Sequence, residues 1–572
     1  MSIVRLRSSL FLLAMCLPLT ACGATKMVGN DDDLDGGTGG PESGSDWEIG
    51  GEEGGPGPTL SGLELTPSNA VVTIDTATTP PTRAVQNFVA TLNNSDGTSK
   101  DVSSTATFTL DDATLGSFAG PTFTSTDTLP GGKLGITTIV RAEAEGKSGA
   151  ANLTIIQLRK SGEKRDFFFT VPYMGTPDPE KDVLKFGTNI KQVDVAFNMD
   201  TTGSMSGSIT NLRSALSGSL FPKLVAAIPS VGLAVVDHKD YPVCSHGSGG
   251  DFPVRVYQRM TTVLTEAQSA TTKYSASGGY DGPESQVPSM WHILTGGALN
   301  WSGGTVAKYT PKPGTFGGVD FRPGSLPVVV LITDVSWHDV TRDPYCSSVT
   351  SPPTIAMLKT EFTKVNARFV DITSYDEAQA NDLSDATKSN LAPSAFGSTC
   401  GAQCPTGVSG ACRAATGPGG TCRLNFLHSG GSGVSDSIVK AIQAISVGSQ
   451  FDVTAVPSND PTNAPGEDGS PVDAVKFIKA LRAMDEGDPK NSCPPQAAKD
   501  TNGDGVKDTF TSVKVGTPVC FEVLPQMNTT VKPKAEAQFF NAFIDVLGMP
   551  GSVKLDRRTV LFLVPPREIT AK

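Results

Sequence analysis

Oxygen-bearing side chains follow an apolar segment in the run Asp200-Thr201-Thr202-Gly203-Ser204-Met205. The carboxylate of Asp200 and the hydroxyls of Thr202 and Ser204 stand at alternate positions on a tight glycine turn. Carboxylate and hydroxyl oxygens are the donors that hard divalent cations such as Mg²⁺ prefer. The spacing therefore predicts a metal site with Asp200, Thr202 and Ser204 among its ligands.

Strand-like and helix-like segments alternate around this motif over residues 189–448. Short apolar runs predict strands at 193–199, 231–236, 254–257, 328–332, 367–372 and 423–427. Apolar residues at helical spacing predict helices at 212–224, 355–365 and 434–445. This alternation predicts an α/β doubly wound sheet, in which ligands bind beyond the carboxyl ends of the strands.

The run from Asp200 to Met205 resembles the D-x-[ST]-x-S signature of von Willebrand factor A (vWA) domains, which forms their metal-ion-dependent adhesion site. The resemblance covers residues 189–448, and the run 232–242 also resembles the second strand of such domains. It implies Asp334 as a further ligand, because Val329-Val330-Leu331-Ile332-Thr333-Asp334 resembles the strand that delivers the family's third-loop aspartate.

The second-loop ligand is less directly matched. The stretch Gly278-Gly279-Tyr280-Asp281-Gly282-Pro283-Glu284-Ser285 resembles a GGxDxPE variant of that loop, and we take Asp281 as the ligand. Thr305, after Gly303-Gly304, is the alternative. The resemblance implies Mg²⁺, or Mn²⁺ or Ca²⁺, held so that a carboxylate of a partner completes its coordination.

These features predict a divalent-metal-dependent adhesion or ligand-binding protein, whose partner is a protein or surface that presents a carboxylate. The alternative is a structural scaffold that organises an envelope complex. We do not expect an enzyme, since the chain has no HExxH, GxSxG or P-loop motif, and His338 is interpreted as a loop residue rather than a base. With 46 Lys and Arg against 58 Asp and Glu, the formal charge of −12 excludes nucleic acid as an expected partner.

The first 22 residues predict the compartment. Arg5 and Arg7 precede an apolar run that is too short to span a bilayer and suits an export signal. The signal ends in Leu19-Thr20-Ala21-Cys22, which resembles the lipobox of bacterial lipoproteins and implies lipidation of Cys22. We therefore expect a lipid anchor at the outer membrane or cell surface, followed by an acidic, glycine-rich tether over 23–60.

Strand-rich regions flank the vWA-like region. Residues 61–158 resemble a bacterial immunoglobulin-like domain of the second group, with short strands separated by turns. Residues 449–572 predict a second β-rich domain. The similar segments Phe167–Pro172, in the connector 159–188, and Val560–Pro565 are expected to pair in one sandwich, into which the vWA-like region is inserted.

A second cation motif lies in the C-terminal region. Oxygen side chains stand at positions 1, 3, 5 and 9 of a calcium-type loop, with Gly505 at position 6; they are Asp500, Asn502, Asp504 and Asp508. Position 12 is Thr511 instead of Glu. We predict structural Ca²⁺ at 500–508, with a simple Asx turn as the alternative.

The chain has ten cysteines, of which Cys16 lies in the signal and Cys22 is the expected lipid site. The remaining eight predict four disulfides in an oxidising compartment. The candidates are Cys244, Cys346, Cys400, Cys404, Cys412, Cys422, Cys493 and Cys520. Zinc binding by the four cysteines of 400–422 is the alternative, but the paired CxxC spacing of zinc sites is missing there.

Overall fold

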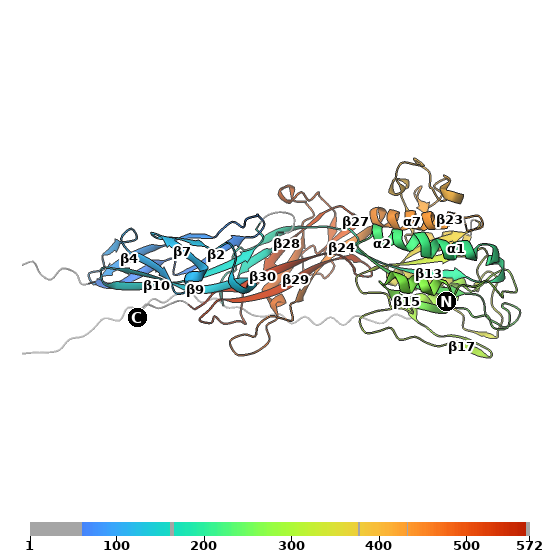
Figure 1. The fold of residues 1–572 in the computed structure, drawn as a ribbon, viewed down its shortest axis with the longest axis horizontal. Coiled ribbons are helices and arrows are strands. Elements are labelled where there is room, and N and C mark those ends of the chain that lie inside the picture. The colour runs from blue at the N-terminus through green and yellow to red at the C-terminus, as the bar shows by residue number, and fades with distance from the viewer. Residues whose placement is uncertain (1–59, 161–164, 376–377, 432, 568–572) are drawn as a thin grey trace, which may run out of the picture. The chain divides into compact units, whose positions relative to one another are not determined.

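The computed structural model describes residues 60–160, 165–375, 378–431 and 433–567. The predicted signal peptide, Cys22 and the tether up to residue 59 lie outside the described residues. Within the described part of the chain, no helix is both long and apolar enough to cross a membrane. The protein is strand-rich and multidomain, and along the chain its α/β region is preceded and followed by segments built from strands (Figure 1).

The α/β region is built on a six-stranded sheet in the order β15-β14-β13-β18-β20-β23. The strands are β13 (Gln192–Asp200), β14 (Ser230–His238), β15 (Arg255–Thr261), β18 (Leu326–Ile332), β20 (Arg368–Thr373) and β23 (Asn425–Leu427). All neighbouring pairs are parallel except β14 with the edge strand β15. The loops that follow β13, β14 and β18 therefore meet at one edge of the sheet.

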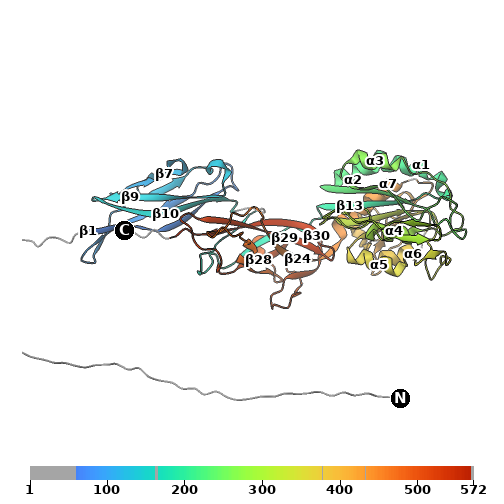
Figure 2. The ribbon, with the colours of Figure 1, turned by 90° about the horizontal axis from the view of Figure 1, so that it is seen from below.

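Helices cover both faces of this sheet. The helices are α1 (Ile209–Ala215), α2 (Phe221–Ala227), α3 (Leu264–Thr271), α4 (Gln286–Thr295), α5 (Ile355–Lys364), α6 (Ala378–Ala386) and α7 (Val434–Gly448). Figure 2 shows α1, α2, α3 and α7 on one face and α4, α5 and α6 on the other. Each face of the sheet has its own apolar core, because successive strand residues point to opposite faces. Phe197 of β13 lies in one core with Leu224 of α2, and Ala196 lies in the other core with Met290 of α4.

The strands of this sheet differ from the expected ones mainly at the edge. The run expected at 254–257 is β15 (Arg255–Thr261), whose residues are mostly half-buried because it pairs on one side only. A π-helical turn at Leu216–Leu220 separates α1 from α2, where leucine spacing predicted one continuous helix.

Two regions consist, in their described residues, of strands and short 3₁₀ turns. The first has its own apolar core and holds β1 (Leu60–Thr66), β2 (Asn69–Asp75), β3 (Val85–Asn87), β4 (Val89–Asn94), β5 (Ser99–Asp101), β6 (Thr107–Leu110), β7 (Gly116–Ala119), β8 (Thr122–Ser125), β9 (Gly135–Ala144) and β10 (Lys147–Leu158). Its sheets have the orders β1-β4-β5, β2-β10-β9-β6 and β3-β8-β7.

The second strand region combines segments from both sides of the α/β region. They are β11 (Phe167–Thr170), β12 (Asp182–Phe186), β24 (Gln450–Asn459), β25 (Ile478–Ala483), β26 (Ala498–Lys499), β27 (Thr509–Lys514), β28 (Val519–Pro525), β29 (Gln538–Met549) and β30 (Val553–Val564). β11 pairs in parallel with β30, with Phe167 opposite Val560. These are the two segments that were predicted from the sequence to pair. The α/β region is thus inserted in the chain between β12 and β24.

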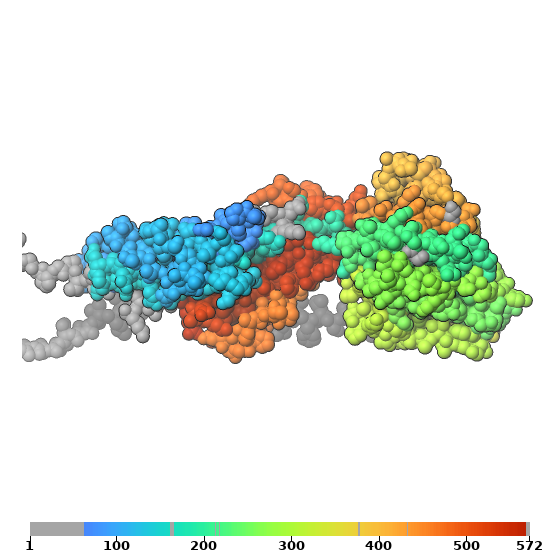
Figure 3. Space-filling model, in the orientation of Figure 1, coloured from blue at the N-terminus to red at the C-terminus, as the bar shows by residue number. Residues whose placement is uncertain are grey.

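A disulfide-bonded insert precedes the last sheet strand of the α/β region. Cys400 pairs with Cys412, and Cys404 pairs with Cys422. In the space-filling view, this gold-coloured part of the chain stands out from the surface of the α/β region (Figure 3). The two disulfides compensate for the small apolar core that such a glycine-rich insert can form.

Candidate metal centre

Asp200 ends β13 at the carboxyl edge of the sheet, and its side chain is fully buried. The next turn folds back over it: the backbone N–H and the hydroxyl of Thr202 both donate to Asp200 Oδ1, at 2.9 and 2.6 Å. Thr202 then starts a short 3₁₀ turn, Gly203–Gly207, which leads into α1. The tight turn thus holds the Thr202 hydroxyl directly against the carboxylate.

Ser204 and Asp334 continue this line of oxygen atoms. The hydroxyls of Thr202 and Ser204 lie 3.2 Å apart, and Ser204 Oγ donates to Asp334 Oδ1 at 2.9 Å. Thr333, next to Asp334 after β18, donates to Asp200 Oδ2 at 2.8 Å. The structure therefore brings together four of the predicted ligands, Asp200, Thr202, Ser204 and Asp334.

The two carboxylates are in an unfavourable electrostatic environment. Burial raises the pKa of Asp200, which Lys239 and the hydroxyl donors only partly offset. Burial and the charge of Asp200 together raise the pKa of Asp334. Two carboxylates and two hydroxyls form a hard oxygen donor set that fits Mg²⁺, and a divalent cation among them would balance the negative charge.

Lys239 fixes the loops around this group of oxygen atoms. Its ammonium group donates to the backbone carbonyls of Thr201 and Ser277. It therefore ties the turn after β13 to the loop that precedes α4. Gly203 N–H also donates to the carbonyl of Gly278 at 2.9 Å, so this second loop lies directly against the metal-site turn.

Asp281, predicted as the second-loop ligand, is directed elsewhere. Its Oδ2 lies 3.0 Å from His246 Nδ1 and 3.3 Å from His338 Nε2, and its backbone N–H donates to the His246 carbonyl. Gly278 and Gly279, both at positive φ, turn the chain before Asp281 toward the His246 loop. The assignment of Asp281 to the Asp200 group is therefore corrected. The alternative, Thr305, bonds to Leu299 and Asn300 within its own hairpin.

Glu284 is the second-loop carboxylate that the sequence interpretation missed. A β-carbon placed on Gly279 would stand 2.8 Å from Glu284 Oε1 and 3.1 Å from Thr202 Cβ, so the two side chains are close neighbours. Glu284 is buried, and its Oε2 has no hydrogen-bond partner among the described residues. Burial, followed by the charge of Asp200, raises the pKa of Glu284 to about 11. The sequence offered Glu284 as a candidate ligand, because it lies three residues after Asp281 in the same loop, in the pair Pro283-Glu284.

Replacing Glu284 by glutamine is expected to lower the affinity for Mg²⁺ by at least about tenfold, because it removes a carboxylate beside Thr202. The raised pKa means that Glu284 is protonated at neutral pH without a cation, and glutamine imitates this neutral form. We therefore expect an unchanged melting temperature in EDTA. Calorimetric titration with MgCl₂ and thermal unfolding in EDTA measure the two effects; an unchanged Mg²⁺ affinity would separate Glu284 from the site.

The predicted calcium loop is exposed and closed by its own hydrogen bonds. Asp500 accepts from the backbone N–H groups of Gly503 and Gly505, at 2.7 and 2.9 Å, which lower its pKa. The side chain of Asn502 donates to Asp504, and Asp508 accepts from Thr501. These are the contacts of the Asx-turn alternative, and calcium binding at this loop stays a prediction.

The eight candidate cysteines form four disulfides, as predicted. Besides the two in the insert, Cys244 pairs with Cys346 and Cys493 pairs with Cys520. The Cys244–Cys346 bond joins the loop after β14 to the loop after β18, at the same edge of the sheet as Asp200. Four disulfides are typical of proteins exported to an oxidising compartment.

No protein-family model matches the sequence, and no curated protein matches it. Among solved structures, a von Willebrand factor type A protein from Catenulispora acidiphila aligns over 80% of this chain and 73% of its own, with 9% identity and a TM-score of 0.26.

The pilus adhesin SpaC from Lactobacillus rhamnosus GG, in an open conformation, aligns over 80% of this chain with 11% identity and a TM-score of 0.26. The match spans 55% of that adhesin's length. Proximal thread matrix protein 1 from the mussel byssus aligns over 35% of this chain and 40% of its own, with 12% identity and a TM-score of 0.20. At these TM-scores the alignments do not define the fold.

Proposed function

We propose that this chain is a vWA-type binding protein of the cell envelope, which uses a divalent cation, Mg²⁺ in the first instance, to bind a carboxylate of a partner. The proposal includes the doubly wound α/β class for the inserted region. It also includes anchoring of the chain through a lipid on Cys22, at the outer membrane or cell surface. We propose binding, not catalysis, as its activity.

One observation carries the proposal. Asp200, Thr202, Ser204 and Asp334 come from two loops at the carboxyl edge of the sheet and form one continuous series of contacts. The predicted metal-ion-dependent adhesion site requires this convergence, because Asp334 is far in the sequence from the other three ligands. Glu284 adds a carboxylate on the side of the second loop.

The four side chains of the Asp200 group differ in solvent exposure, so the group is open to solvent on one side. Asp200 and Thr202 are buried, Asp334 is half-buried, and Ser204 is exposed. A bound Mg²⁺ would supply a Lewis acid that attracts an anionic oxygen from outside. The two hydroxyls would hold that cation without neutralising its charge, and the exposed Ser204 marks the side from which a carboxylate would reach it.

Tyr280 is an exposed aromatic residue on the second loop, which lies against the metal-site turn through the hydrogen bond from Gly203 N–H to the Gly278 carbonyl. Its side chain is 74% exposed, and it follows Gly279, whose backbone lies against Thr202. Aromatic side chains of this kind often dominate binding interfaces. We expect Tyr280→Ala to weaken partner binding by about tenfold or more while the affinity for Mg²⁺ stays unchanged. An equal loss of both would show that Tyr280 only supports the loop.

The proposal is tested with the full-length protein on beads that carry an immobilised glutamate-rich peptide. We expect retention in MgCl₂ and release in EDTA, whereas beads with a glutamine-rich peptide of equal length retain nothing. Retention that is independent of both the cation and the carboxylates would contradict a metal-dependent receptor and favour the scaffold alternative.

A further inference from the structure

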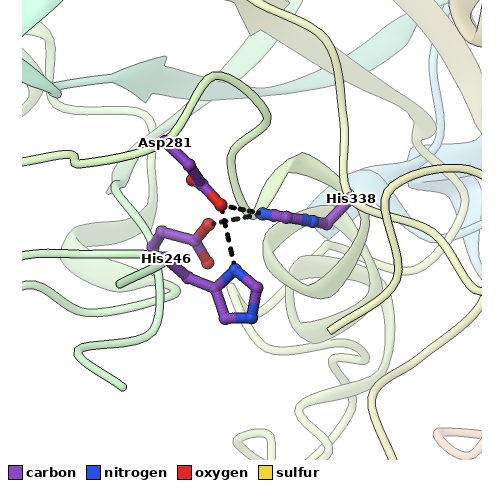
Figure 4. Close-up of side chains that lie close together, drawn as sticks. His246, Asp281 and His338 are labelled. Carbon is purple, nitrogen blue, oxygen red and sulfur yellow. Dashed lines mark hydrogen bonds and ion pairs between the residues drawn. The ribbon is translucent and has the colours of Figure 1, made fainter. Parts of the chain in front are cut away.

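A second group of metal-ligand side chains lies at the same edge of the sheet, separate from the Asp200 group. One ligand atom from each of Asp240, His246, Asp281 and His338 lies within 4.8 Å of all the others. Asp240 and His246 follow β14, Asp281 precedes α4, and His338 follows β18. Figure 4 shows Asp281, His246 and His338 directed toward one another.

His338 points one ring nitrogen, Nε2, at two carboxylates. Its Nδ1 pairs with the carbonyl of Asp343 and therefore carries the ring proton. Its Nε2 lies 3.2 Å from Asp240 Oδ2 and 3.3 Å from Asp281 Oδ2. The His338 side chain is only 3% exposed and that of Asp240 is 0% exposed. Neither His338 Nε2 nor Asp240 Oδ2 has a hydrogen-bond partner with acceptable geometry among the described residues.

The spacing of these atoms fits a shared cation better than a shared proton. Ligands of a tetrahedral metal at about 2.0–2.1 Å stand about 3.4 Å from one another. A charge-assisted N–H···O bond brings nitrogen and oxygen to about 2.7–2.9 Å. The distances from His338 Nε2 to both carboxylates, 3.2 and 3.3 Å, are close to the separation expected for metal ligands.

The neighbouring contacts are those that orient metal ligands. A metal-bound histidine usually donates its other ring N–H to a carbonyl or carboxylate, as His338 does to Asp343. Asp240 Oδ1 accepts from the backbone N–H of Tyr241 at 2.6 Å, which directs Oδ2 toward His338. His246 Nε2 accepts from the N–H of Cys346, so its Nδ1 carries the proton and donates to Asp281.

We infer that His338 Nε2, Asp240 Oδ2 and Asp281 Oδ2 bind a divalent transition metal of the Zn²⁺ class, with His246 as a positioning residue for Asp281. The imidazole ligand distinguishes this site from the all-oxygen Asp200 group, since nitrogen donors favour transition metals over Mg²⁺ and Ca²⁺. Asp281, with a side chain that is 31% exposed, forms the solvent side of the site. The metal joins three loops that surround the Asp200 group.

The test uses full-length protein stripped with EDTA and titrated with ZnCl₂ against a chromogenic chelator, in millimolar MgCl₂. We expect one tight Zn²⁺ equivalent. His338→Phe keeps an aromatic ring but has no ring nitrogen, and Asp240→Asn removes a buried carboxylate; each should weaken Zn²⁺ binding by at least about 100-fold. Asp281→Asn, at the exposed rim, is the variant least expected to disturb folding, and it should also weaken Zn²⁺ binding.

Two further variants separate this inference from the proposed function. His246→Asn keeps an N–H donor near Asp281 and should retain Zn²⁺ affinity within about tenfold. Asp200→Ala should lose Mg²⁺ but keep the Zn²⁺ site. The inference is overturned if the unaltered protein has no tight Zn²⁺ equivalent or if folded His338→Phe and Asp281→Asn variants bind Zn²⁺ as well as it does. A loss in His246→Asn equal to that in His338→Phe would overturn the role given to His246.

Discussion

Replacing Asp200 by alanine is expected to lower the affinity for Mg²⁺ by at least about 100-fold and to abolish Mg²⁺-dependent retention on a carboxylate surface. Asp200 is the buried carboxylate of the group, and the Thr202 backbone N–H and hydroxyl both donate to it. Its loss removes a ligand and also releases the turn that holds Thr202. Calorimetric titration with MgCl₂ measures the first effect, and the bead assay measures the second.

Asp500→Ala is the matched control for this variant, since it also removes one aspartate, but from the exposed loop of the C-terminal region. It should leave both Mg²⁺ affinity and retention unchanged. Asp200→Asn preserves the shape of the side chain and should lose Mg²⁺ affinity as well. Full Mg²⁺ affinity in a folded Asp200 variant would contradict the assignment of the site.

Removing the Cys244–Cys346 disulfide should cause the largest loss of stability among the four. The bond spans 102 residues, and its removal by the double replacement C244S/C346S frees a long loop in the unfolded chain. On the chain-entropy model, closing a loop of this length contributes about 4.7 kcal/mol to the free energy of unfolding. Urea denaturation monitored by tryptophan fluorescence should therefore show a lower midpoint.

The disulfide of the insert supplies the comparison. Cys400 and Cys412 are separated by 12 residues, so C400S/C412S should cost about 3 kcal/mol, clearly less than the long-range pair. Equal losses from the two double variants, or a larger loss from the insert, would show that loop length does not control their contributions.

Three ligands of the metal site could be predicted from the sequence because they lie within five consecutive residues, so their relative positions depend mainly on the local backbone. Asp200, Thr202 and Ser204 lie on one turn, and a glycine turn after a strand places them together almost independently of the rest of the fold. Asp334 was predicted differently, from the resemblance of the apolar strand before it, β18, to the vWA strand that precedes the family's third-loop aspartate. The spacing on one turn thus predicted three of the four converging side chains, and the family resemblance predicted the fourth.

The loop residues could not be predicted in the same way. The direction of Asp281 depends on the positive φ angles of Gly278 and Gly279 and on a contact with the loop of His246, 35 residues earlier. Glu284 is instead held by backbone hydrogen bonds to Ser336 and His338. Hydrophobic periodicity carries no information about such loop contacts, so the sequence placed the wrong carboxylate at the site.

The fold shows the same division between core and edge. Buried strands such as β13 and β18 extend only one or two residues beyond the runs predicted for them. The edge strand β15 and the π-helical turn at Leu216–Leu220 differ more from the predicted strand and helix. Neither has a continuous row of buried apolar residues from which its bounds could be predicted. The long-range pairing of β11 with β30 was detectable only through the similarity of their two apolar segments.

The most direct test of the metal-dependent site is an anomalous difference map from crystals of the full-length protein grown with MnCl₂. The expected result is a manganese peak within metal-ligand distance of Thr202 Oγ1 and Ser204 Oγ, inside the Asp200 group. A map with no peak there, or with its sole peak among Asp240, Asp281 and His338, would contradict a carboxylate receptor built on Asp200.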